Sequence, residues 1–421
     1  MRVPRRRPAP GAGPVSLLLQ GATDLDGARA DVRIDAGRVT AVAPALPPQP
    51  GEDVVDLAGH WLLPAPAEPH AHLDKALTSH RVPNPTGDLA GAITAIRAIA
   101  ADFTHDDLVE RATRAAYEYL ANGTTAIRTH ADVGAHAGTR HLRALVQVRD
   151  ALAGLVDVQV VALLSAPWTE LEAAATPRLL AEAIDAGADV VGGVPHLWGD
   201  RAAGLTTSFD AALAAGLPLD LHTDETLDPT AQGLRDLARR VTATGFDLGV
   251  TAGHCVSLGV HPLEVARSTA AEVARAGIGV VTLPQTNLFL QGRDAGVAPP
   301  RGLTAVRTLL DAGATVAGGG DNLRDPFNPM GRADACEAAS LLVTAGHLST
   351  REAWHAVSAG ARACLGLPVP AVAVGSVAEF LAIGAESLDA AVAGAGTSRV
   401  VVSRGRVVAR SRLSRTVLSP T

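Results

Sequence analysis

The chain has 421 residues, 47% of them hydrophobic and 19% charged, so it can bury a large core and is not a disordered protein. Its formal net charge of −7 argues against a nucleic-acid-binding surface, which requires clustered positive charge. The three cysteines form no Cys-x-x-Cys pair, which excludes a disulfide framework and a cysteine metal site and favours a cytoplasmic location.

Both ends of the chain differ in composition from its middle. Residues 1–14, MRVPRRRPAPGAGP, are basic like the start of a targeting signal, but the apolar stretch after them is too short for one. We expect these residues to form a disordered arm. Residues 15–59 and 370–421 alternate apolar and polar side chains between turn residues. We therefore expect one small β-sandwich domain formed from both chain ends, and no membrane span, because no apolar run reaches about 18 residues.

Residues 60–369 alternate short aliphatic runs with alanine-rich helical stretches. Strands that alternate with helices pair in parallel, and eight such units favour an α/β fold of the (β/α)₈ (TIM) barrel type. A doubly wound open sheet is the alternative. The expected strands are Trp61–Pro66, Thr124–Thr129, Val158–Leu164, Asp189–Val194, Pro218–His222, Leu248–Ala252, Gly279–Leu283 and Thr315–Gly318.

Several expected strands follow a helix that ends in glycine, as in ANGTTAI, DAGADVV, AAGLPLD, RAGIGVV and DAGATVA. Glycine directly after a helix adopts the left-handed conformation without a Cβ penalty, so it makes a natural connection from helix to strand.

Histidine and aspartate residues gather at the carboxyl ends of the expected strands. His70 and His72 follow the first strand, and two positions apart in an extended chain they point to the same side. His222 ends the fifth strand, His254 the sixth and Asp321 the eighth. In a barrel these ends share one rim, where active sites are built. Imidazole and carboxylate ligands suit Zn²⁺ or Fe²⁺, so the pattern predicts a metal site.

Other histidines are expected to play different roles. His130, Asp132 and His196 lie at the same rim, where we expect them to support the site or to line it. Solvated or capping roles are expected for the histidines in loop and helix contexts: His60, His80, His105, His136, His141, His261, His347 and His355.

Six motifs follow one another in order: AEPHAHLDKAL, RTHADV, HTDET, TAGH, NLFLQGRD with PPRGLTAVRTLLDAG, and GGGDNLRDPFNPMG. Over roughly residues 60–365 they resemble the cytosine deaminase-like branch of the amidohydrolase superfamily, whose members include hydrolases of N-substituted triazines.

The resemblance implies one catalytic divalent metal, Zn²⁺ or Fe²⁺, with four ligands: His70, His72, His222 and Asp321. Glu225 matches the family's proton-shuttling glutamate, and His254 matches the histidine that orients and activates the water. Asp321 would also accept a proton from that water. Relatives with two metals carry a carboxylated lysine at the end of the fourth strand, but GADVVGGVPH holds neither lysine nor glutamate, which favours one metal.

Four residues are expected to bind the substrate. Lys75, the single lysine, could reach a substrate oxygen or a neighbouring carboxylate where arginine would clash; a surface salt bridge is the alternative. Ser165, Asn322 and Phe327 replace the glutamine, second aspartate and stacking tryptophan of cytosine deaminase. A site built for one heterocycle edge rejects others, so we expect a small nitrogen heterocycle other than cytosine.

Three functions remain open from the sequence. The first is hydrolytic deamination of an amino-substituted heterocycle or cyclic amidine. The second is cleavage of an N-alkylamino or cyclic amide C–N bond, for which Leu163, Leu164 and Pro167-Trp168 would supply an apolar pocket edge. The third is a non-catalytic barrel. Barrels of this type are often oligomeric, so a homo-oligomer is also open.

Overall fold

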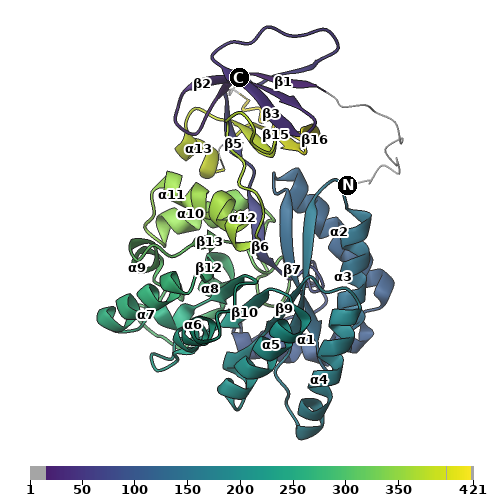
Figure 1. The fold of residues 1–421 in the computed structure, drawn as a ribbon, viewed down its shortest axis with the longest axis vertical. Helices are drawn as coiled ribbons and strands as arrows, with labels where there is room; N and C mark the ends of the chain where they lie inside the picture. The colour runs from purple at the N-terminus through teal and green to yellow at the C-terminus, as the bar shows by residue number, and fades with distance from the viewer. Residues whose placement is uncertain (1–15, 395, 419–421) are drawn as a thin grey trace.

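The computed structural model describes residues 16–394 and 396–418, so the arm expected at residues 1–14 lies outside the described residues. The chain builds two sheets, one above the other in the view of Figure 1. We call the upper one the end sheet, because both chain ends contribute strands to it. The lower one is the barrel sheet.

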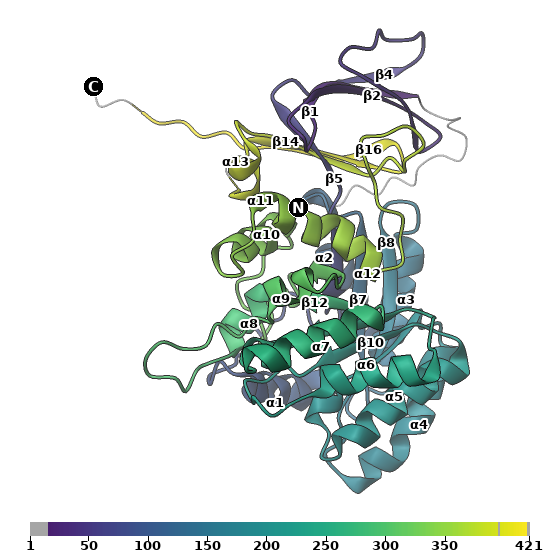
Figure 2. The same ribbon diagram turned by 60° about the vertical axis from the view of Figure 1, so that its left-hand side comes forward.

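The end sheet has the strand order β16-β15-β14-β5-β1-β2-β3, with β4 beside β1. Its strands are β1 (Leu17–Thr23), β2 (Arg29–Asp35), β3 (Arg38–Ala43), β4 (Asp53–Asp56), β5 (His60–Pro64), β14 (Phe380–Gly384), β15 (Ser398–Ser403) and β16 (Arg406–Arg412). In Figure 2, β2 and β4 lie over β14 and β16. Leu19, Ile34, Phe380 and Val402 belong to one apolar core. This confirms the predicted β-sandwich from both chain ends.

The barrel sheet has the order β13-β12-β11-β10-β9-β8-β7-β6, and every neighbouring pair is parallel. Its strands are β6 (Ala67–Ala71), β7 (Ala126–Val133), β8 (Asp157–Leu164), β9 (Val190–Gly193), β10 (Leu219–Thr223), β11 (Val250–His254), β12 (Gly279–Thr282) and β13 (Val316–Gly318). A bridge between Ala71 and Asp321 closes the barrel. The predicted (β/α)₈ barrel is confirmed, and the open sheet is excluded.

Helices surround the barrel: α1 (Leu89–Ile99), α2 (His105–Ala121), α3 (Arg140–Ala151), α4 (Glu170–Asp185), α5 (Arg201–Ala215), α6 (Gly233–Thr244), α7 (Leu263–Arg275), α8 (Pro284–Leu290), α9 (Val306–Asp311), α10 (Ala335–Thr344), α11 (Thr350–His355) and α12 (Ala361–Cys364). One more helix, α13 (Leu388–Val392), lies between β14 and β15 beside the end sheet (Figures 1 and 2). The glycines expected between helix and strand all have positive φ: Gly123, Gly187, Gly216, Gly277 and Gly313. None of the helices in the described ranges is long and apolar enough to cross a membrane.

The prediction for the first barrel strand is wrong. The run Trp61–Pro66 belongs mainly to β5, which pairs with β14 in the end sheet, and the first barrel strand is β6. Both strands are short, and the partner of β5 lies near the other end of the chain, so the local pattern cannot assign β5 to its sheet. As a consequence, His70 lies within a strand and not after one. The other seven predicted strands each overlap an observed barrel strand.

Candidate active site

Three histidines and one aspartate meet at the carboxyl ends of the barrel strands. His70 lies in β6, His72 directly after it, His222 in β10 and Asp321 just beyond β13. His222 Nε2 is 3.1 Å from Nε2 of both His70 and His72. Asp321 Oδ1 is 3.4 Å from His72 Nε2 and 3.9 Å from His70 Nε2. The structure therefore brings together the four side chains expected to be metal ligands, and all of them are buried.

The chemistry of this cluster fits a divalent cation. Burial lowers the pKa of His70, His72 and His222 well below the usual value, so their neutral rings expose lone pairs. Burial and the nearby carboxylate of Glu225 raise the pKa of Asp321, a cost that a cation would remove. Within residues 16–394 and 396–418, neither Asp321 oxygen has a hydrogen-bond partner of good geometry. Converging nitrogen and oxygen donors of this kind suit Zn²⁺ and related metals.

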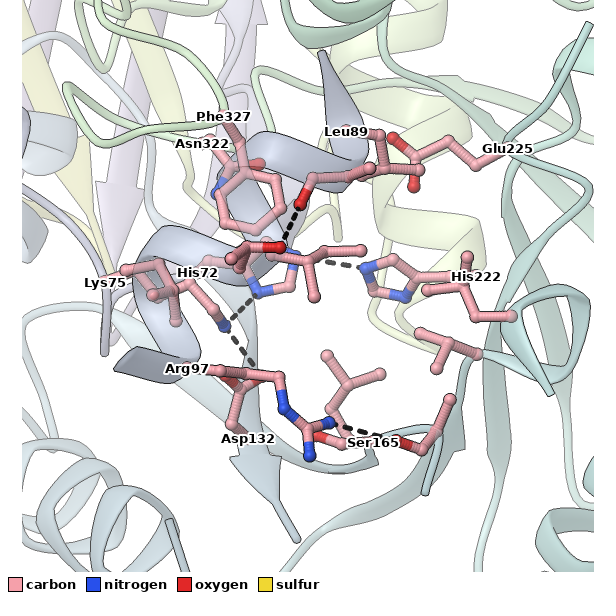
Figure 3. A pocket seen from close by; sticks show the side chains of 18 of the residues that line it. His72, Lys75, Leu89, Arg97, Asp132, Ser165, His222, Glu225, Asn322 and Phe327 are labelled. Atoms are coloured by element: carbon pink, nitrogen blue, oxygen red, sulfur yellow. Dashed lines mark hydrogen bonds and ion pairs between the residues drawn. The ribbon is translucent and has the colours of Figure 1, made fainter. Parts of the chain in front are cut away.

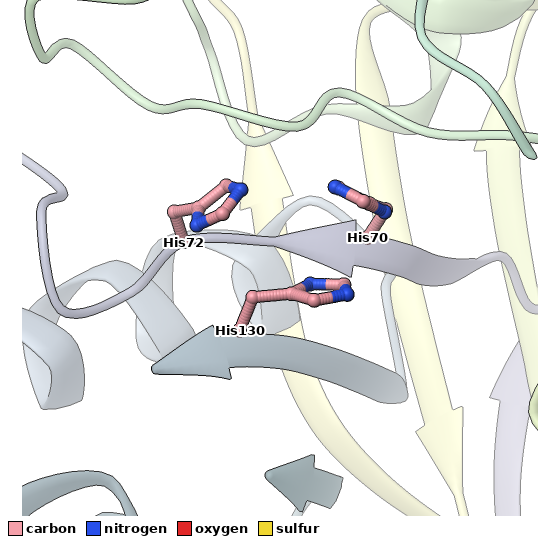
Figure 4. Close-up of side chains that lie close together, drawn as sticks. All are labelled: His70, His72 and His130. Carbon is pink, nitrogen blue, oxygen red and sulfur yellow. The ribbon is translucent and has the colours of Figure 1, made fainter. Parts of the chain in front are cut away.

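His130 in β7 lies beside His70 and His72 (Figure 4), and donor atoms of these three residues are within 4.8 Å of one another. Its own ring nitrogens have other partners, however. His130 Nε2 is 3.2 Å from Asp220 Oδ1, and Nδ1 is 3.3 Å from the carbonyl oxygen of Ala71. Both ring nitrogens of His130 are thus engaged by groups outside the four side chains expected to be ligands.

Glu225 and His254 lie next to the cluster. His254 Nε2 is 3.9 Å from Asp321 Oδ2, and Nδ1 is 3.5 Å from Glu225 Oε1 and 3.1 Å from Asn287 Oδ1. Burial raises the pKa of Glu225 to about 8 and lowers that of His254 to about 3. At neutral pH the site thus offers a protonated carboxyl group beside a neutral imidazole.

A cavity of about 270 Å³ opens onto these residues (Figure 3). Its lining includes the four side chains expected to bind substrate: Lys75, Ser165, Asn322 and Phe327. One wall is apolar and contains Leu89, Ile93, Leu163, Val194 and Leu197. The cavity therefore combines a polar side near the cluster with an aliphatic side.

Lys75 is buried in this polar side, between His72 and Asp132 (Figure 3), so the surface salt bridge considered for it is wrong. Its Nζ is 2.7 Å from Asp132 Oδ1, 3.4 Å from both carboxylate oxygens of Asp74 and 3.3 Å from His72 Nδ1. Burial works against the charge, but Asp132 and Asp74 outweigh it and raise the pKa of Lys75 above its ordinary value.

The solvated role predicted for His141 is also wrong. This residue is fully buried in α3, and its Nδ1 is 2.8 Å from Asp74 Oδ2. His136, expected to be solvated as well, lines the cavity, with Nε2 3.7 Å from Asp132 Oδ2. Their burial depends on how the segment after β7 packs against the first strand, which a helix or loop context does not reveal.

Helix α1 is a part of the site that the sequence did not indicate. Leu89, Ile93 and Arg97 of this helix line the cavity. The Arg97 guanidinium lies 3.8 Å from the ring centre of Trp168, and its Nη2 is 2.8 Å from Glu172 Oε2. The sequence signal that could have revealed α1 is a helical stretch that begins after the capping residue Asp88. It is an additional helix, because it lies between the first barrel strand, β6, and helix α2.

The apolar edge expected from the third strand is only partly correct. Leu163 and Trp168 line the cavity. Leu164, by contrast, packs in the barrel core, because adjacent residues of a strand point to opposite faces.

Comparison with known proteins agrees with this geometry. The sequence model of a protein family, described as "Amidohydrolase family", matches residues 104–409 of this chain. The chain is 34% identical over 391 residues to a pterin deaminase of Rhizobium rhizogenes, covering 91% of this chain and 88% of that protein.

Two solved structures are also similar. A 5-methylcytosine deaminase from Klebsiella pneumoniae has a TM-score of 0.85 and 26% identity, with 96% of this chain and 100% of that chain covered. An N-isopropylammelide isopropylaminohydrolase from Burkholderia multivorans has a TM-score of 0.79 and 31% identity, with 94% and 98% covered.

A (β/α)₈ barrel with a histidine–aspartate cluster at its carboxyl rim defines a metal-dependent hydrolase. The chain belongs to the amidohydrolase family, whose members hydrolyse carbon–nitrogen bonds other than peptide bonds. The resemblance expected from the motifs is thereby confirmed.

Proposed function

We propose that the chain is a hydrolytic deaminase that acts on an amino-substituted nitrogen heterocycle and uses one metal ion, Zn²⁺ or Fe²⁺. The observation that carries the proposal is the convergence of four ligand-type side chains with Glu225 at the base of one cavity. The similarity to a pterin deaminase and to a 5-methylcytosine deaminase supports it.

His70, His72, His222 and Asp321 would hold the metal. When bound, a divalent metal supplies a water that is acidic enough to act as a nucleophile near neutral pH. Nitrogen and oxygen ligands accept both Zn²⁺ and Fe²⁺. Strand β9 brings neither lysine nor glutamate to the rim to hold a second ion, which supports a mononuclear site.

The remaining polar groups would divide the proton transfers. Glu225 can donate its proton to a ring nitrogen, which makes the adjacent carbon more electrophilic, and can then take up the remaining proton of the added water and pass it to the departing amine. His254 donates its Nδ1 proton to Asn287 Oδ1, which leaves Nε2 as an acceptor for the attacking water. Asp321, on the same side, can accept a proton from that water.

The cavity would orient a planar substrate through four contacts. Lys75 and Ser165 offer donors, and Phe327 offers a ring face. Asn322 donates an N–H of its side-chain amide, at Nδ2, to Asp325 Oδ2 at 2.7 Å. The other side-chain amide atom, Oδ1, is left to accept an N–H group of the substrate. These groups favour a heterocycle that carries both N–H and C=O functions.

A second candidate activity is hydrolysis of an N-alkylamino or cyclic amide bond. The aliphatic wall of Leu89, Ile93, Leu163 and Leu197 would hold an alkyl substituent. The similarity to the N-isopropylammelide isopropylaminohydrolase supports this alternative.

The released product distinguishes the two candidates. Metal-loaded protein would be incubated with aminopyrimidines, amino- and alkylaminotriazines, pterins and cyclic ureas, and ammonia and alkylamines would be quantified. Ammonia release is the expected result, and release of an alkylamine would support the second candidate. If the whole panel is left unchanged, both candidates are contradicted.

The role of Glu225 is tested by Glu225→Gln. The variant should keep its metal content, because Glu225 is not a ligand, and should lose about 10²- to 10⁴-fold in kcat, the range for a missing general acid. Glu264→Gln, at an exposed position of α7, is the matched control and should turn over normally. Wild-type turnover by Glu225→Gln would contradict the assignment.

A further inference from the structure

Glu68 is a buried glutamate whose two carboxyl oxygens contact the backbone on both sides of the cluster formed by His70, His72, His222 and Asp321. It lies in β6, two residues before His70. Its Oε1 accepts the backbone N–H of His70 at 3.1 Å, and its Oε2 accepts the N–H of Gly320 at 2.9 Å. One of these bonds holds a proposed ligand itself, and the other holds the residue directly before Asp321.

The bond from Gly320 crosses the seam of the barrel, while the bond from His70 lies within β6. Strands β6 and β13 are the two edges of the barrel sheet, and the bridge between Ala71 and Asp321 joins them. The ladder from β6 to β7 also shifts register between Glu68 and Ala71. Buried N–H groups outside a regular ladder need another acceptor. The carboxyl group of Glu68 supplies an acceptor oxygen on each side of the seam.

Two glycines make room for this carboxylate. A Cβ atom at Gly319 would lie 2.5 Å from Glu68 Oε1, and one at Gly320 would lie 3.2 Å from Oε2. Both distances are shorter than ordinary carbon–oxygen contacts. The glycines before Asp321 therefore let the chain after β13 come close enough to bond with Glu68.

We propose that Glu68 is a positioning residue that sets the spacing between the histidines of the first strand and Asp321 across the seam. The ligand atoms whose spacing it would set are His70 Nε2 and Asp321 Oδ1, 3.9 Å apart. Groups that orient metal ligands typically change metal affinity by about 10- to 100-fold. The inference rests on the ligand set proposed above.

The test is Glu68→Gln, measured by zinc affinity in competition with a chelator and by the visible spectrum of the Co²⁺-loaded full chain. The amide keeps the shape of the side chain, but its NH₂ group meets an N–H that needs an acceptor. We expect zinc binding about 10- to 100-fold weaker and an altered cobalt ligand-field spectrum. The metal-free variant should still fold, with a melting temperature only a few degrees below that of the wild type, because one buried N–H loses its acceptor.

Glu379→Gln is the matched control, because Glu379 is another buried glutamate that accepts a backbone N–H, from Arg404 at 2.7 Å, beside the end sheet. It should bind zinc normally. Unchanged zinc affinity and an unchanged cobalt spectrum in Glu68→Gln would overturn the inference. Failure of metal-free Glu68→Gln to fold would also overturn the inference, because Glu68 would then be needed for the barrel itself.

His72→Ala tests the ligand set separately from Glu68. If His72→Ala binds zinc like the wild type, the ligand set and with it the proposed function fail. If His72→Ala loses zinc while Glu68→Gln keeps it, only the inference on Glu68 fails.

Discussion

Lys75 illustrates how much a single residue can depend on its surroundings. Lys75 is the single lysine of a chain that otherwise uses arginine. It lies among His72, Asp74 and Asp132. A compact ammonium satisfies both carboxylates in a space where a planar guanidinium would meet His72. Lys75 thus keeps two buried carboxylates charged at the edge of the substrate cavity.

Removal of this ammonium should destabilise the protein. Lys75→Met leaves Asp74 and Asp132 buried without their cation, which costs about 3–5 kcal/mol in the free energy of unfolding. Denaturant titration measures this difference. The control is Arg404→Met, which removes the half-exposed partner of Asp157 and should cost less than about 1 kcal/mol. An equal decrease in the free energy of unfolding in the two variants would contradict the prediction, because the buried Lys75 would then stabilise the fold no more than the half-exposed Arg404.

Helix α1 has the clearest functional role among the elements, because it forms a wall of the cavity. Asp88 caps its first turn by accepting the N–H of Gly91 at 2.7 Å. Ala92 and Ile96 of this helix are buried. Arg97, near its end, pairs with Glu172 of α4. The helix is thus held at both ends over the site.

Loss of the cap should weaken substrate binding. Asp88→Ala removes about 1 kcal/mol of helix stability, which corresponds to an increase in KM of up to about fivefold if the wall must re-form on binding. The kcat and the zinc affinity should change little. Steady-state kinetics on the best substrate of the panel measures both constants.

Thr104→Ala provides the comparison, because Thr104 caps α2 in the same way but does not line the cavity. Its KM should equal that of the wild type. A normal KM in Asp88→Ala would mean that α1 is not part of the substrate wall.

At the scale of the whole molecule, the end sheet and the barrel are tied together through Arg362 in α12. Its buried guanidinium donates to the carbonyl oxygen of Ala65 at 3.4 Å and to Thr125 Oγ1, and lies 3.7 Å from Glu379 Oε2. Ala65 lies where the chain passes from β5 to β6. Figures 1 and 2 place α12 beside the end sheet and α1 at the far end of the barrel.

Arg362→Met should lower stability without affecting the site. The buried Glu379 loses its cation, so we expect a loss of about 3–5 kcal/mol. The melting temperatures measured by far-UV and by near-UV circular dichroism should fall by the same amount. The reason is that the end sheet and the barrel both lose their contacts with Arg362. Zinc affinity should stay at the wild-type value, since the ligands lie at the opposite rim. A clear fall in zinc affinity would contradict this separation.

The sequence predicts the structure correctly where the signal is local. Glycines such as Gly216 and Gly313 mark the change from helix to strand because their backbone conformation excludes most other residues. His222 could be found because it lies at the carboxyl end of a recognisable strand, and His70 and His72 because their His-x-His spacing is itself a local pattern, although the strand expected before them belongs to the end sheet. Glu68 and Arg97 gave no such signal, since their roles depend on partners that are distant in the chain.

By itself, the sequence determined the barrel, the side chains that gather at its rim and the membership of the amidohydrolase family, because periodicity, glycine connections and ordered motifs are local properties of the chain. Only the tertiary structure decided that β5 belongs to the end sheet, that Lys75 and His141 are buried, and that α1 closes the cavity. These outcomes depend on pairing and burial between segments far apart in the sequence, and no local pattern encodes which distant surface a strand or side chain will meet.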